Sequence, residues 1–153
     1  MSNNLRYLHC IFADDIRQEV SGKQIVVGMY QGGMSVRGPL PANLPKLQVM
    51  ALLNIPRTDS VASLKLTVLM NTTVMAEIDV PRQALPNRDQ TPPDLKGHIL
   101  QIAIELVPFA VEGSGKLQVH ALINGSEILE GNTLHITHEP DSPSEPTPLG
   151  AKS

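Results

Sequence analysis

The acidic cluster next to a predicted strand end consists of Asp14, Asp15 and Glu19. Loops at the ends of β-sandwiches can gather carboxylates around Ca²⁺, which prefers oxygen ligands. The loop pattern of an EF-hand is absent, however, and Arg17 lies inside the cluster. We therefore expect the carboxylates to cap a short turn and to pair with Arg17 or Lys23. Asp14, Asp15 and Glu19 remain the candidate metal ligands if the chain binds a cation.

The other residue types that could do chemistry are isolated. The five histidines are His9, His98, His120, His135 and His138. A zinc site needs three or four ligands with a defined second shell, and only His120 and His135 share a parity on neighbouring predicted strands. Solvated histidines are therefore expected, with no metal and no cofactor.

Nucleophilic catalysis has no support in the sequence. Cys10 lies in an apolar run, where a free cysteine behaves as a small hydrophobe with a high pKa. Ser114 lies between two glycines but lacks the Gly-x-Ser-x-Gly pattern of a nucleophile elbow. Walker and dinucleotide-binding patterns are absent as well. We predict that the protein is not an enzyme.

Composition narrows the class of protein. The 153 residues suit one domain, and 12 Lys and Arg against 15 Asp and Glu give a net charge of −3. This balance disfavours nucleic-acid binding, and no run is long and apolar enough for a membrane-spanning helix. The single cysteine excludes an internal disulfide. No secretory signal is recognisable at the N-terminus, so we expect a cytoplasmic protein.

The two ends of the chain differ in composition. Residues 1–138 contain almost all of the apolar residues and are predicted to form the domain. Glu139–Ser153 carries four prolines and almost no apolar side chain. Such a segment cannot offset its own ordering entropy, so a flexible, disordered tail is expected.

The body of the chain alternates between apolar and polar residues with period two, which is typical of strands. The pattern covers residues 46–55, 64–70, 74–80, 98–107, 116–123 and 134–136. Leu5–Ala13 and Gln24–Tyr30 are apolar at both parities, so we expect them in the middle of a sheet. Between them, Asp14–Val20 could form one or two helical turns, as could Arg82–Leu85.

Turn residues separate the runs. Asn124-Gly125 is typical of a type I′ hairpin, and Asn71-Thr72-Thr73 and Gly32-Gly33 join other pairs. About eight short strands are too many for one open sheet of this length. The predicted fold is an all-β, immunoglobulin-like antiparallel β-sandwich, with a closed barrel as the alternative.

Part of the sequence resembles a family of small bacterial and phage proteins known only as a domain of unknown function. Ala13–Tyr30 has the family's acidic-x-x-Arg-x-Glu turn, Gly-Lys, apolar strand and Gly-x-Tyr. The start of the strand at Leu44-Pro45-x-Leu47 matches too, as does Pro108-Phe109 followed by Gly115 and an Asn-Gly hairpin. The resemblance implies a β-sandwich and supplies no activity or site residues.

Four apolar residues occupy the outward parity of three consecutive predicted strands: Met50, Leu52, Leu69 and Met75. If these strands are neighbours, the four side chains form an apolar strip on the outside of one sheet. Methionine-rich patches suit adaptable contacts with a partner protein. The sequence therefore favours a non-enzymatic protein-binding or assembly module, with a protein partner or a second copy of itself, as in a homodimer. The alternative is a sandwich that binds a small ligand or Ca²⁺ through the Asp14–Glu19 turn.

Overall fold

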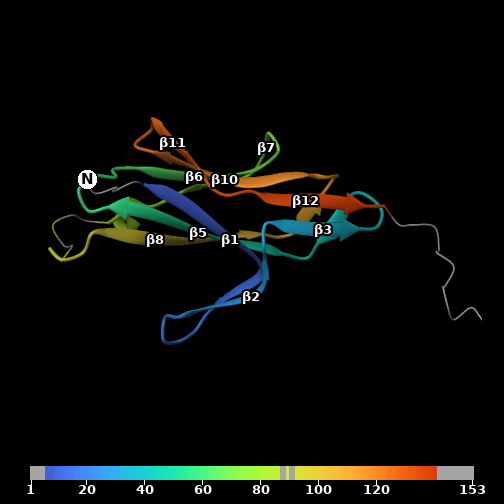
Figure 1. The fold of residues 1–153 in the computed structure, drawn as a ribbon, viewed down its shortest axis with the longest axis horizontal. Coiled ribbons are helices and arrows are strands. Elements are labelled where there is room, and N and C mark those ends of the chain that lie inside the picture. Colours follow the sequence, from blue (N-terminus) through green and yellow to red (C-terminus); the bar gives the residue numbers. More distant parts are fainter. Residues whose placement is uncertain (1–5, 87–88, 90–91, 141–153) are drawn as a thin grey trace, which may run out of the picture.

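Two β-sheets lie face to face in the computed structural model of this chain (Figure 1). The structure describes residues 6–86, 89 and 92–140. The predicted all-β sandwich is confirmed. Twelve strands occur among the described residues, more than the eight expected, because several short strands accompany the long ones. The same residues contain no helix of the length and apolarity needed to cross a membrane.

The first sheet has four antiparallel strands in the order β2-β1-β5-β8. Their bounds are β1 Tyr7–Gln18, β2 Gln24–Tyr30, β5 Leu47–Pro56 and β8 Gly97–Leu106. β5 is the central strand and pairs along its whole length with β8. β1 lies between β2 and β5, but only Phe12 and Ala13 pair on both sides, so the predicted inner position of Leu5–Ala13 is not found for Tyr7–Ile11, which pair with β5 alone. β2 forms the edge of the sheet. The prediction that Gln24–Tyr30 lies in the middle of a sheet is wrong.

The second sheet has the order β3-β12-β10-β6-β7, with β11 also paired to β10. The bounds are β3 Gly33–Arg37, β6 Leu64–Met70, β7 Thr73–Asp79, β10 Gly115–Ile123, β11 Glu127–Glu130 and β12 Leu134–Glu139. β3 and β12 are parallel and the other pairs are antiparallel. A small third sheet joins β4 Ala42–Leu44 to β9 Phe109–Val111. β12 ends at Glu139, and the rest of the predicted tail, residues 141–153, lies outside the described residues.

The local predictions at turns mostly hold. Asn124 and Gly125 both adopt positive φ between β10 and β11, as a type I′ turn requires. Asn71 also has a positive φ at the turn between β6 and β7. Arg82–Ala84 forms a single 3-10 turn. Asp14–Val20, in contrast, forms no helical turn, because β1 continues to Gln18 and pairs with β2.

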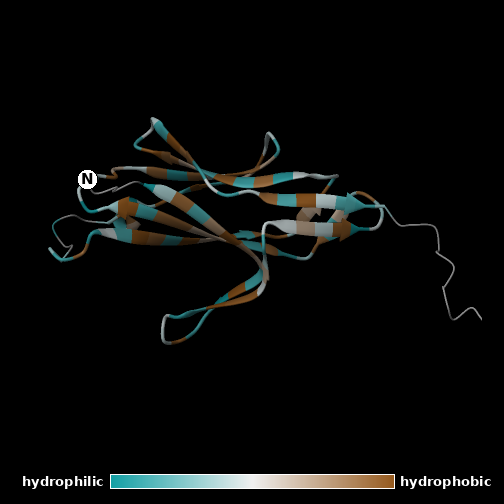
Figure 2. Ribbon diagram, in the orientation of Figure 1, coloured by the Kyte–Doolittle hydropathy of each residue, from teal (hydrophilic) through white to brown (hydrophobic). Residues whose placement is uncertain are grey.

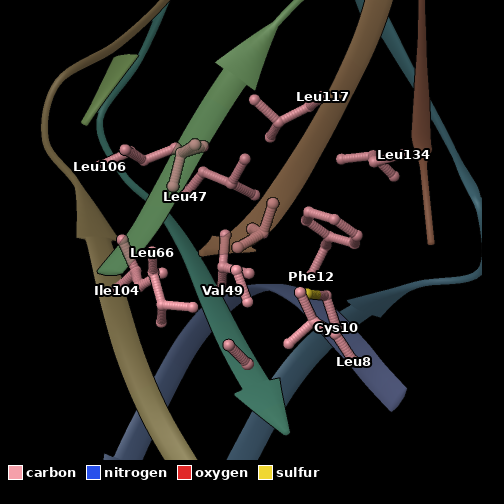
Figure 3. Packing of buried hydrophobic residues seen from close by; sticks show 14 of the residues in the cluster. Leu8, Cys10, Phe12, Leu47, Val49, Leu66, Ile104, Leu106, Leu117 and Leu134 are labelled. Atoms are coloured by element: carbon pink, nitrogen blue, oxygen red, sulfur yellow. The ribbon is translucent and has the colours of Figure 1, made fainter. Parts of the chain in front are cut away.

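The core lies between the two sheets and is built from the inward parity of the long strands (Figure 3). Alternating hydrophobic and hydrophilic residues follow most strands of both sheets (Figure 2). The largest fully buried side chains include Phe12, Leu47, Leu66, Ile104 and Leu117. These come from strands of both sheets, so burial of apolar surface is what holds the layers together.

Candidate protein-binding site

β1 belongs to two different structures along its length. Tyr7–Ala13 pairs with β5 inside the sandwich, whereas Phe12–Gln18 pairs with β2. From Asp14 onward, β1 has left β5, and together with β2 it forms a two-stranded hairpin. We call residues 14–29 the arm. Figure 1 shows it leaving the four-stranded sheet and extending away from both layers.

The root of the arm is held by residues at the start of β5. The Lys46 ammonium lies 2.6 Å from one Asp15 carboxylate oxygen, and Arg17 lies 2.5 Å from the other. The side-chain oxygen of Gln48 accepts a hydrogen bond from the backbone N–H of Ile16. This N–H would otherwise lose its partner where β1 leaves β5. The hydrogen bond from Lys46, followed by that from Arg17, lowers the pKa of Asp15 below its ordinary value.

A second polar contact lies on the opposite face of the root. The Tyr30 hydroxyl donates a hydrogen bond of 2.5 Å to Asp14. Burial, and then the Asp14 carboxylate, raise the pKa of Tyr30 to about 12. The Asp14 carboxylate lies directly over Gly28, whose φ is +68°, and a Cβ at this position would collide with Asp14 Oδ2. Glycine is therefore required here both by its backbone conformation and by the space that Asp14 occupies.

The three candidate metal ligands are not brought together. Asp14 and Asp15 are adjacent in a strand, so their side chains point to opposite faces. Glu19 lies beyond the strand, in the turn, and accepts a hydrogen bond of 3.2 Å from Ser21. Throughout the described part of the chain, no group of three or more His, Cys, Asp and Glu side chains is placed to hold a metal ion. The expected pairing with Arg17 is present at Asp15.

The arm exposes apolar side chains on both of its faces. All residues from Arg17 to Met29 are exposed. The large apolar residues among them are Val20, Ile25, Val26, Val27 and Met29, with exposed fractions of 109%, 41%, 38%, 44% and 54%. Across the described chain, twelve large hydrophobic residues are exposed, and these five lie within ten residues of each other. The exposed apolar side chains are therefore concentrated in the arm and are not scattered evenly over the surface.

The predicted apolar strip does not form. Met50 and Leu52 lie on β5 of the four-stranded sheet, whereas Leu69 and Met75 lie on β6 and β7 of the other sheet. The prediction assumed that three consecutive strands are neighbours in one sheet, but the chain crosses between the layers after β5. Met50 is only 4% exposed, and Leu52 is half-buried on the same strand.

A β-bulge changes the facing of Met75. The register between β6 and β7 shifts between Val68 and Leu69, which leaves Met75 as the extra residue on β7. Met75 therefore packs against the core, while its neighbour Val74 is 51% exposed. Strict alternation along residues 74–80 predicts Val74 inside and Met75 outside. The prediction is wrong for both residues, because the extra residue at the bulge inverts which side chains face the core.

The cysteine, serine and histidine residues that could support catalysis are buried, hydrogen-bonded to the backbone or far from one another. Cys10 is buried, and burial raises its pKa to about 12, so the thiol stays protonated. Ser114 accepts a hydrogen bond of 2.9 Å from the backbone N–H of His138. His120 and His135 are not opposite each other, because His120 pairs with Thr67 and Glu130 whereas His135 pairs with Lys116 and Gly33.

Two surface pockets of about 340 Å³ lie away from the arm. One is lined by Met70, Met75, Glu112 and Ser114 near the turn between β6 and β7. The other is lined by Asp59, Ser60, Arg82 and Leu85. The Asp59 carboxylate is paired to Arg6 at 2.5 Å, so it joins the segment between β5 and β6 to the residue before β1.

Comparisons with protein-family models, with curated proteins and with solved structures find no match to this chain. The candidate site therefore stands on its own geometry. Sequence reasoning missed the arm, although the signal was present: Gln24–Tyr30 contains no charged residue and is apolar at both parities. That pattern indicates burial on both faces, and the described chain does not provide it.

Proposed function

We propose that this chain is a non-enzymatic protein-binding or assembly module and that the arm carries the contact. The observation that carries the proposal is the exposed β2 strand, which is apolar on both faces and projects from the sandwich. Exposed apolar surface costs free energy in water, so a strand of this composition is stabilised when a partner covers it.

The root contacts support the same interpretation. Lys46, Gln48 and Tyr30 tie the arm to the sandwich at three points. A hairpin held at its root is pre-organised for binding, because less conformational entropy is lost when a partner covers it. The polar residues at this place hold the arm in position, and the proposal gives them no catalytic role.

The resemblance to small bacterial and phage proteins supports a bacterial or phage origin for the module. The sandwich would then act as the scaffold that presents the arm. Binding residues are often found on segments that a rigid scaffold positions.

The test is capture of partners from a native host by the full chain and by two charge variants. In Ile25→Lys/Val27→Lys, two lysines replace apolar residues of the arm. In the control, Ile128→Lys, a lysine replaces a residue of β11 that is 61% exposed. We expect the wild-type chain and the control to bind the same proteins, or further copies of the chain, and the arm variant to bind none.

Equal binding by all three proteins would place the contact outside the arm. Circular dichroism and the melting temperature must remain unchanged in both variants for the comparison to count. We expect this, since substitutions at exposed positions usually change stability by less than about 0.5 kcal/mol.

A further inference from the structure

We propose that the partner of the arm is a second copy of this chain, through antiparallel pairing of β2 with β2 of that copy. This inference rests on the proposed function and specifies its partner. The four-stranded sheet ends at β2, so the outer edge of this strand has no neighbour in the sheet. A free edge presents a row of N–H and C=O groups that can pair with another strand.

Apart from the left-handed Gly28 near its root, the edge of β2 lacks the protection that exposed edge strands usually carry. Charged residues, especially lysine, and prolines normally discourage strand addition. Gln24–Tyr30 has neither. By contrast, the edge of β1 within the sandwich is closed at Cys10, where Asn132 accepts from the backbone N–H at 2.6 Å and donates to the C=O at 2.9 Å. One edge is closed by a side chain, and the other is left open.

The charges that flank β2 favour an antiparallel self-pair. Lys23 precedes the strand at the tip of the arm, and Asp14 lies over Gly28 at its root; both are exposed. Antiparallel pairing brings the tip of one arm to the root of the other, so a lysine approaches a carboxylate. Parallel pairing would bring the two Lys23 residues together, with Glu19 across each turn on the β1 side, and would bring the two Asp14 carboxylates together at the roots. Between these ends the strand is uncharged, so no like charges face each other across the pair.

Pairing with a second copy would also stabilise the arm. A two-stranded hairpin is marginally stable in water, and three or more strands are needed for independent stability. Two arms joined through β2 form a four-stranded ribbon. The contact is also closed, because the same edge is used by both copies, so pairing stops at a dimer.

The exposed apolar area sets the strength of the dimer. The five large apolar residues of the arm expose on the order of 400–500 Å² per copy, the size of the largest patch on a typical monomer. Edge-to-edge pairing joins the strands through their backbones and leaves both faces of the ribbon partly exposed, so two copies bury well below roughly 1,000 Å² of this surface, less than most specific interfaces do. We expect a reversible dimer whose population depends on protein concentration.

The first measurement is light scattering coupled to size exclusion of the full chain over a wide concentration range. The wild-type mass should rise from one copy to two copies. Ile25→Lys/Val27→Lys should remain at the mass of one copy, and the control Ile128→Lys should behave as the wild type does. A wild-type protein of one-copy mass throughout, or a dimer that survives the arm substitutions, would overturn self-pairing. So would growth beyond two copies, which indicates open stacking of β2 on another edge such as β8.

A cysteine reporter tests the geometry. Val27→Cys, at the centre of the seven-residue strand β2, should form a disulfide-linked dimer under mild oxidation, whereas Ile128→Cys should not. The native Cys10 is buried and does not interfere. Cross-linking of Ser21→Cys at the arm tip in preference to Val27→Cys would overturn the antiparallel arrangement. If the chain never dimerises but the arm still captures another protein, the inference fails while the proposed function stands.

Discussion

The first half of β1, Tyr7–Phe12, and the strand β2 both lack charged residues but have different surroundings. Leu8, Cys10 and Phe12 face the core from the first half and are almost fully buried. In the second half, Ile16 is only half-buried, and the strand opposite it exposes Val26 and Val27. An apolar strand is therefore stabilised by burial wherever it lies in the fold. Whether the burial is supplied within the chain or by another chain depends on what lies next to it.

The largest difference between the first half of β1 and the arm is expected in how much each contributes to the free energy of unfolding. Phe12→Ala should lower the free energy of unfolding by about 3–5 kcal/mol, because it leaves a cavity where the side chain is 2% exposed. Val27→Ala in the arm should change it by less than about 0.5 kcal/mol, because the side chain is 44% exposed. Urea denaturation at low protein concentration measures both. Similar losses at the two positions would mean that the arm belongs to the core.

The next largest effect on stability is expected at the edge of β1 that Asn132 closes. Asn132→Ala removes both hydrogen bonds to the backbone of Cys10 and leaves these groups without a partner. A cost of about 1–3 kcal/mol is expected. Gln101→Ala, an exposed position on β8, serves as the control. An unchanged unfolding midpoint for Asn132→Ala would show that water replaces the amide at this edge.

Gly28 tests the root of the arm. Gly28→Ala should make the arm open more readily, by about 1–2 kcal/mol for the left-handed backbone alone, with a further cost from contact with Asp14. Gly22→Ala is the matched control, since Gly22 has a φ of +90° but open space around it. Hydrogen exchange of the arm amides should therefore accelerate more in Gly28→Ala. Equal acceleration of hydrogen exchange in Gly28→Ala and Gly22→Ala would show that contact with Asp14 makes no contribution.

The smallest expected effect is the pH dependence of the melting temperature that arises from the ion pairs of Asp15 at the root of the arm. Because the pKa of Asp15 is lowered in the folded chain, its ion pairs stabilise the protein above the ordinary carboxyl pKa. This stabilisation is lost as the pH falls through the lowered value. Asp15→Asn should therefore melt slightly below the wild type at neutral pH and together with it in strong acid. Glu19→Gln should show no such convergence, and a pH-independent gap for Asp15→Asn would contradict the account.

Local chemistry made much of the fold predictable. Period-two runs located the long strands to within a few residues, and Asn124-Gly125 located a hairpin, because these signals depend only on near neighbours. The apolar strip failed for the opposite reason. Assigning Met50 and Met75 to one surface required the order of the strands and the position of a bulge, and neither follows from alternation along a single strand.

The sequence by itself determined an all-β sandwich, an inert buried Cys10, and a strand from Gln24 to Tyr30 that needs apolar neighbours on both faces. These properties depend on residue type and on the spacing of adjacent side chains. Only the tertiary structure decided that β5 and β6 belong to different layers, that Asp14 and Asp15 serve different partners, and that β2 stands at an open edge. Each of these depends on contacts between residues far apart in the chain, which composition and periodicity do not encode.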